Sequence, residues 1–117
     1  MAEDIILVFG WGPEEAGRAA SLLYIAETAE AMGLTVGIFL FTDGVVLAKR
    51  GVAERISESV GRRFSHALRS ENIRVYVCEE AAKTRGLVDK DFEPGASIMG
   101  YAAFLDKSLE AKAVISV

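Results

Sequence analysis

The single cysteine, Cys78, follows a predicted strand and precedes a predicted helix, a position that gives a thiol unusual chemistry. The β-forming run 75–77 leads directly into it, and a helix-compatible segment follows it and stops at Gly86. The carboxyl ends of strands in open α/β sheets bind ligands, and the N–H groups at a helix N-terminus favour a thiolate. The position alone leaves a second interpretation open, in which Cys78 is only a small buried apolar residue, as free cysteines often are.

The chain offers a second candidate loop after another apolar run. Residues 36–41 predict a strand buried on both faces of a parallel sheet, and Asp43 and Gly44 follow it. An Asp-Gly pair indicates a turn. At the carboxyl edge of the sheet, Asp43 is also a candidate site residue.

A third loop follows the apolar run 5–9, which predicts another buried strand. Gly10 and Trp11 of this loop are candidate binding residues, with simple packing of Trp11 as the alternative. A dinucleotide-binding reading is disfavoured, because the third glycine of that fingerprint would fall at Glu15. The acidic residues at 14 and 15 would also repel a pyrophosphate.

The remaining pattern places helices between these strands. Pro13 suits the first position of a helix that Gly33 ends, and residues 52–71 predict another helix with room for a break at Gly61 and Ser65. A further helix is expected over 101–110 and a last strand over 113–117. The alternation predicts one α/β domain over residues 1–117, a three-layer sandwich. Its mostly parallel sheet has about five strands, with helices on both faces.

Composition excludes several classes of protein. Half of the 117 residues are hydrophobic and two are proline, as expected for a folded domain, and no apolar run is long enough to span a bilayer. The acidic start lacks the features of a signal peptide, and one cysteine cannot form an internal disulfide. We therefore expect a reducing, cytoplasmic setting.

Charge is uneven along the chain. The net charge is −4, but residues 49–74 hold seven basic and three acidic side chains. Such a segment is usually a solvated helix face, although it is also able to dock an acidic partner. The acidic total disfavours nucleic-acid binding. With one histidine, His66, and no cysteine near it, we expect no metal site and no cofactor.

Several segments together resemble the DsrE/DsrF-like family of small sulfur-relay proteins. They are the loop at 41–45, the strand 75–77 with Cys78, the Arg-Gly-Leu of residues 85–87, and a final short strand. The resemblance implies a compact α/β sandwich that assembles as trimers or hexamers. It also implies that Cys78 carries sulfane sulfur between donor and acceptor proteins, and that Asp43 and Gly44 lie in the loop facing it. Arg85 is included as a binding residue.

Three functions compete at this level. The first is a sulfur carrier that accepts a persulfide or thiosulfonate on Cys78. The second is an oligomeric binding module with a packed cysteine. The third is a one-cysteine peroxidase, which Glu79 and Glu80 disfavour because it needs a positively charged pocket. We expect the sulfur to project from the carboxyl edge of the sheet and not into the core.

A surplus of large apolar residues favours an oligomer. The residues that are many for one small domain to bury are Trp11, Tyr24, Phe92, Met99, Tyr101 and Phe104.

Overall fold

The computed structural model describes residues 2–117, which form a five-stranded sheet with the order β4-β3-β2-β1-β5 and all strands parallel. The strands are β1 (Ile5–Phe9), β2 (Val36–Leu40), β3 (Ile73–Cys78), β4 (Ala96–Met99) and β5 (Ala113–Ser116). The three strands with the most continuous apolar sequences are the central ones. Their side chains are covered on both faces, whereas the shorter edge strands β4 and β5 remain partly exposed.

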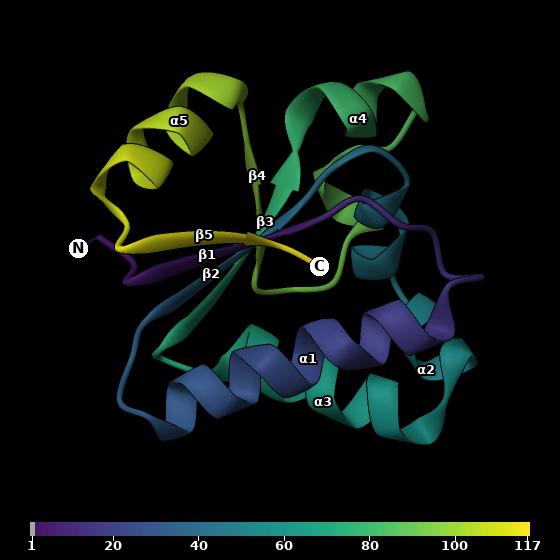
Figure 1. Cartoon of the computed structure of the whole chain (residues 1–117). Coiled ribbons are helices and arrows are strands. Elements are labelled where there is room, and N and C mark those ends of the chain that lie inside the picture. Colours follow the sequence, from purple (N-terminus) through teal and green to yellow (C-terminus); the bar gives the residue numbers. More distant parts are fainter. Residues whose placement is uncertain (1) are drawn as a thin grey trace.

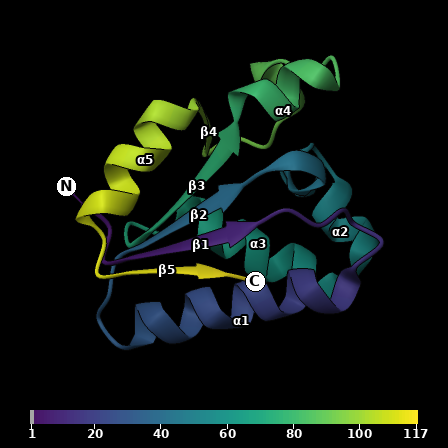
Figure 2. The same cartoon turned by 45° about the horizontal axis from the view of Figure 1, so that its top comes forward.

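Helices cover both faces of this sheet, which confirms the predicted architecture. Helices α1 (Ala16–Ala31) and α3 (Glu58–Arg69) pack side by side below the sheet, and α5 (Tyr101–Glu110) lies above it (Figures 1 and 2). The shorter helices are α2 (Val52–Ile56), α4 (Glu79–Thr84), and the 3-10 helices η1 (Thr42–Ala48) and η2 (Asp89–Asp91).

The core has two unequal parts because strand side chains alternate between the two faces. The larger part lies against α1 and α3 and includes Leu7, Ile38 and Phe64. The smaller part lies under α5 and contains Ile6, Phe39 and Tyr76. None of the ten residues of α5 is itself buried. The α5 side of the molecule is therefore the less firmly packed one.

The first helix begins later than its sequence predicts. Pro13 lies in a turn that the N–H of Glu15 closes by donating to the carbonyl of Gly12, at 3.0 Å, and α1 starts at Ala16. The predicted end is confirmed, because Gly33 takes a positive φ of 82° just after the helix.

The helical segment after β2 breaks at Ser57, not at Gly61 or Ser65 as the sequence suggested. The Ser57 hydroxyl accepts a hydrogen bond from the N–H of Val60 at 3.0 Å and caps α3. Gly61 lies inside α3, where a Cβ atom would come within 2.8 Å of the Cα of Glu54. Its role is to let α2 pack closely on α3.

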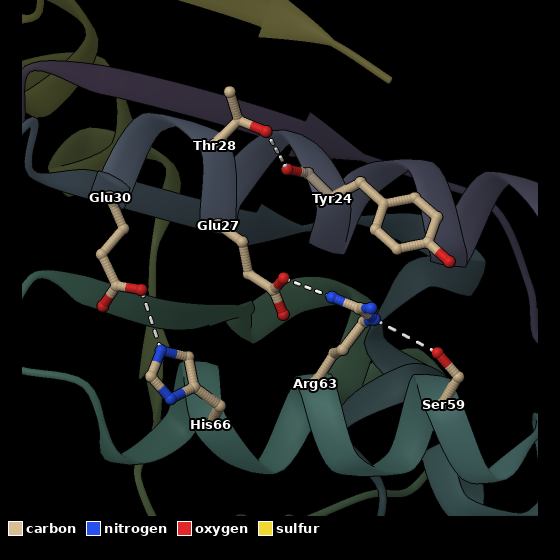
Figure 3. Close-up of polar contacts among 7 residues, drawn as sticks. All are labelled: Tyr24, Glu27, Thr28, Glu30, Ser59, Arg63 and His66. Atoms are coloured by element: carbon tan, nitrogen blue, oxygen red, sulfur yellow. Dashed lines mark hydrogen bonds and ion pairs between the residues drawn. The ribbon is translucent and has the colours of Figure 1, made fainter. Parts of the chain in front are cut away.

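Polar side chains join the outer surfaces of α1 and α3 (Figure 3). Arg63 forms an ion pair with Glu27 and lies 4.6 Å from the ring centre of Tyr24. His66 Nε2 is 2.8 Å from Glu30 Oε1, so the histidine joins α3 to α1. The basic segment is thus partly neutralised by α1, and the other arginines of α3 face solvent.

One charged residue of the described chain is buried, and it fastens α5 to the sheet. Glu3 is 3% exposed, accepts a hydrogen bond from the Tyr76 hydroxyl, and lies 3.3 Å from Lys107 Nζ of α5. Burial acts to raise the pKa of Glu3, but the bonds from Tyr76 and Lys107 oppose it, and the pKa lies below its usual 4.5. Burial, together with the bond to Glu3, raises the pKa of Tyr76.

Candidate functional site

Cys78 lies where the sequence predicts, at the carboxyl end of a central strand. It is the last residue of β3 and the residue immediately before α4, and it pairs with Met99 of β4. Its side chain, however, is 1% exposed, which corrects the expectation of a projecting sulfur. Apolar residues of η1 and α4, among them Val45 and Ala82, belong to the same core cluster as Cys78.

Tyr101, the first residue of α5, follows Met99, the β4 residue that pairs with Cys78, by two positions. The nearby Cys78 is the first of the causes that raise the pKa of Tyr101. Negative charge on Cys78 and on Glu80 acts in the same direction. The Tyr101 ring stacks on Phe41 at 6.1 Å between ring centres and is 53% exposed.

The structure brings two predicted site residues together. Asp43, in the first turn of η1, forms an ion pair with Arg85, which directly follows α4. Arg85 Nη1 also donates to the carbonyl of Ala81 at 3.0 Å, which fixes the guanidinium. Since Cys78 directly precedes α4 and Arg85 directly follows it, the pair ties η1 to the end of α4 that is remote from the thiol.

Gly44 is required by close backbone contact. A Cβ atom at this position would lie 2.3 Å from the carbonyl oxygen of Phe9 at the end of β1. Two residues before it, Thr42 adopts a positive φ of 46°, a strained conformation for a β-branched residue. Its hydroxyl donates to the carbonyl of Gly10 at 2.9 Å, so the loops after β1 and β2 are locked together.

Trp11 lies in the same loop as Gly10 but takes another partner. Its ring is 42% exposed and stacks with the guanidinium of Arg18, at 3.9 Å from the ring centre. It forms part of the rim at the carboxyl edge of the sheet, and no contact ties it to the thiol.

Nothing in the local sequence indicates that Tyr101 lies near Cys78. The register of β3 with β4 is the signal that would have found it, because Cys78 opposite Met99 brings the start of α5 beside the thiol. Glu79 also lies near the start of α5, because its Oε1 is 3.8 Å from the point that a Cβ atom on Gly100 would occupy. Strand register is set by tertiary packing and was not readable from the local pattern.

Neither a metal site nor a membrane-spanning helix is found in the described part of the chain. Among residues 2–117, no three His, Cys, Asp or Glu side chains are grouped so that they could hold a metal ion. Over the same residues, no helix combines the length and the apolar character needed to cross a membrane.

Comparison with known proteins identifies the class to which this fold and cysteine belong. The profile of the DsrE/DsrF-like family matches residues 3–117, and the chain belongs to this family. One relative is the uncharacterized protein MJ0760 of Methanocaldococcus jannaschii, 30% identical over 107 residues. That match covers 89% of this chain and 39% of the relative, so the chain spans about two fifths of the relative's length.

Two solved structures share the fold. The ychN protein from E. coli aligns with a TM-score of 0.83 at 20% identity, covering 98% of this chain and 99% of that one. MTH1491 of Methanobacterium thermoautotrophicum, a protein of unknown function, aligns with a TM-score of 0.76 at 19% identity, covering 97% of this chain and all of its own. At these identities the similarity shows the fold alone.

Proposed function

We propose that this protein is a sulfur carrier that accepts sulfane sulfur on Cys78 and passes it to a partner protein. The observation that carries the proposal is the position of the single cysteine of a DsrE/DsrF-like chain, at the carboxyl end of β3 and the start of α4. Ligands bind at this edge of open α/β sheets.

The chemistry needs a thiolate and a donor. The Cys78 thiolate attacks the outer sulfur of a persulfide donor, the S–S bond of the donor breaks, and the donor leaves as a thiolate. With thiosulfate as donor, sulfite leaves instead. Both reactions give a cysteine persulfide without an external oxidant, and the reverse step onto an acceptor thiolate regenerates Cys78.

A carrier must also hold its sulfur until the acceptor arrives. The 117 residues contain no second cysteine that could attack the persulfide within the same chain. Sulfur therefore leaves only to another protein or another subunit, as relay requires. We place the carrier in the cytoplasm, where a lone thiol stays reduced.

The rim of the site is proposed to receive the donor and acceptor proteins. It comprises Asp43 and Arg85 on one side and Gly10 with Trp11 on the other, with Gly44 holding the two loops together. The Asp43 side chain is 67% exposed, so an approaching chain can exchange partners with this ion pair at small cost.

Intact-mass measurement tests the function directly. The protein is incubated with thiosulfate, tetrathionate or polysulfide, and the expected result is a gain of sulfur that a reductant removes. Cys78→Ser is the matched control and should gain nothing. A wild-type protein left unmodified by all three donors contradicts the proposal.

The burial of the thiol favours a second function, a binding or assembly module in which Cys78 is only packed. Alkylation of the folded protein separates the two. Slow alkylation that speeds up only on denaturation supports the module, and modification of the folded protein within minutes supports the carrier.

We further propose that the protein is an oligomer, with the trimer favoured by family resemblance. Of the apolar residues expected to exceed the monomer core, Phe92 is in fact 2% exposed. Trp11, Tyr24 and Tyr101 do lie on the surface, at 42%, 48% and 53% exposure. The exposed Leu105 and Leu109 of α5 add to this surface.

A further inference from the structure

A cavity of about 480 Å³ lies at the amino end of β3, outside the site described above. Its volume falls within the range of pockets that bind small molecules, about 300–1,000 Å³. It is bounded by the turn between α3 and β3, by the first residues of β3 and by the start of β4. Cys78 lies at the other end of β3, so the cavity and the thiol are separate places in the fold.

The sheet forms one wall of this cavity. Arg74 and Tyr76 are two positions apart on β3 and so belong to the same face of the sheet, and Ser97 of β4 pairs with Tyr76. Tyr76 is covered and only 5% exposed, whereas Arg74 and Ser97 are exposed. All three residues line the cavity, so this wall offers a guanidinium and a hydroxyl group to a ligand.

The end of α3 and the turn after it form a second wall. The Ser70 hydroxyl accepts a hydrogen bond from the N–H of Asn72 at 3.1 Å, which fixes the turn that carries Glu71. Leu68 lies in the last turn of α3, and its carbonyl oxygen is 2.7 Å from the point that a Cβ atom on Gly95 would occupy. Carbonyl groups at a helix C-terminus carry partial negative charge. This wall therefore favours a positively charged group.

Two side chains of opposite charge line the cavity without pairing. Glu71 and Arg74 are three positions apart and both are exposed, yet none of the ion pairs found among residues 2–117 includes either of them. A simple anion near Arg74 would be repelled by Glu71, and a simple cation near Glu71 would be repelled by Arg74. A ligand that carries both charges satisfies both side chains at once.

We propose that this cavity binds a small zwitterion with a carboxylate and an ammonium group, the pair of groups that free amino acids carry. Arg74 binds the carboxylate, because a planar guanidinium suits two-point binding of that group. Glu71 and the carbonyl end of α3 bind the ammonium group. The site goes beyond the proposed carrier function and does not involve Cys78.

Binding of two amino acids to the wild-type protein tests the site. L-Alanine and L-leucine present the same charged groups with side chains of different size, and propionate and ethylamine are alanine without its ammonium group and without its carboxylate. At least one amino acid should bind with a Kd below about 10 mM, as calorimetry will measure. Alanine should bind more tightly than propionate or ethylamine.

The place of binding is read from the backbone amide signals in nuclear magnetic resonance spectra. The N–H signals of Ser70, Glu71 and Ser97 should shift on addition of the amino acid, while that of Cys78 should stay unchanged. Failure of both amino acids to bind, or shifts confined to other parts of the chain, overturns the proposal.

Two substitutions test the two charged groups separately. Arg74→Ala should weaken amino-acid binding about tenfold or more, the effect of losing hydrogen bonds to a charged group. Glu71→Gln should weaken amino-acid binding but strengthen propionate binding, because it removes the repulsion of a lone anion. These opposite changes in one variant cannot arise from a loss of fold. Unchanged affinities for both ligands in Glu71→Gln contradict the zwitterion.

Arg55→Ala is the matched control, because Arg55 of α2 is another exposed arginine outside the ion pairs but does not line the cavity. Its affinity for the amino acids should equal that of wild type, and circular dichroism checks that each variant is folded. Equal affinities of Arg74→Ala and Arg55→Ala overturn the role of Arg74. Sulfur uptake by Arg74→Ala should match wild type, so the outcome here is independent of the carrier function.

Discussion

Replacing Tyr76 with phenylalanine tests how the buried charge at the amino end of the sheet is held. The Tyr76 hydroxyl donates to the carboxylate of Glu3, which is 3% exposed and also pairs with Lys107. Tyr76→Phe keeps the ring, which packs on Phe39 at 5.5 Å between ring centres, and removes only that donor. The variant therefore isolates one hydrogen bond to a buried ion.

The expected cost follows from the charge on the acceptor. A hydrogen bond to a charged group contributes about 1.5–3 kcal/mol, because a buried ion left without its donor is poorly solvated. We expect Tyr76→Phe to lower the free energy of unfolding by that amount at pH 7. Lys107 remains beside Glu3 at 3.3 Å, so the fold should survive the change.

The loss should depend on pH in a direction that the pKa of Glu3 fixes. Folding lowers this pKa below 4.5, so ionised Glu3 stabilises the fold above the pKa of the unfolded chain. This stability is lost as the pH falls through the lower pKa of the folded state. The difference between wild type and Tyr76→Phe should hold from pH 7 to about 5 and shrink at lower pH, where Glu3 is neutral in both proteins.

Urea unfolding of both proteins between pH 7 and pH 3 measures this difference. Tyr24→Phe serves as the control, since it removes the hydroxyl of a half-exposed tyrosine and should change stability by less than about 0.5 kcal/mol. Equal stability of Tyr76→Phe and wild type at pH 7 would refute the assigned role of the hydroxyl. So would a difference that grows as the pH falls.

Four further changes test the site and the surface. Asp43→Asn should cost less than about 1 kcal/mol, because the Asp43 side chain is 67% exposed, yet it should alter the alkylation rate of Cys78. Unfolding with an unchanged alkylation rate would contradict the role of Asp43. Cys78→Ala should keep the fold at a cost of about 1 kcal/mol and abolish sulfur uptake, as calorimetry and intact mass will show. Gly44→Ala should destabilise by about 1–3 kcal/mol in urea, since its Cβ meets the Phe9 carbonyl; a neutral effect would disprove that contact. Leu109 is 85% exposed, so Leu109→Lys should leave the fold intact and weaken the oligomer, as sedimentation will measure. A wild-type protein that is only monomeric at micromolar concentration would contradict the proposed oligomer.

The sheet was predictable because its central strands carry a strong and local signal. The run Ile5–Phe9 is apolar at every position, and such a short run is typical of a strand covered on both faces. Helix boundaries were predicted less well, because they depend on single hydrogen bonds. One such bond, from Glu15 to Gly12, delays α1, and the Ser57 hydroxyl sets the start of α3.

Part of the candidate site could likewise be predicted from the local sequence, whereas the rest depends on contacts between distant segments. The position of Cys78 at the end of a strand was readable from its neighbours, whereas its burial comes from a core cluster that includes residues of η1, far away in sequence. The pair of Asp43 with Arg85 joins segments 42 positions apart. Glu3 also gave no signal, since a glutamate near the start of a chain is ordinarily solvated.

The pairing of β1 with β5 has a consequence for how the chain folds during synthesis. Ile5 of β1 lies beside Ala113 of β5, so β1 leaves the ribosome long before the strand that pairs with its second edge. Until then, β1 offers an open row of N–H and C=O groups, which is a template for pairing with another chain. Contacts this distant in sequence also form slowly. We expect the nascent protein to depend on chaperones at this stage, and premature termination before residue 113 to yield aggregating fragments.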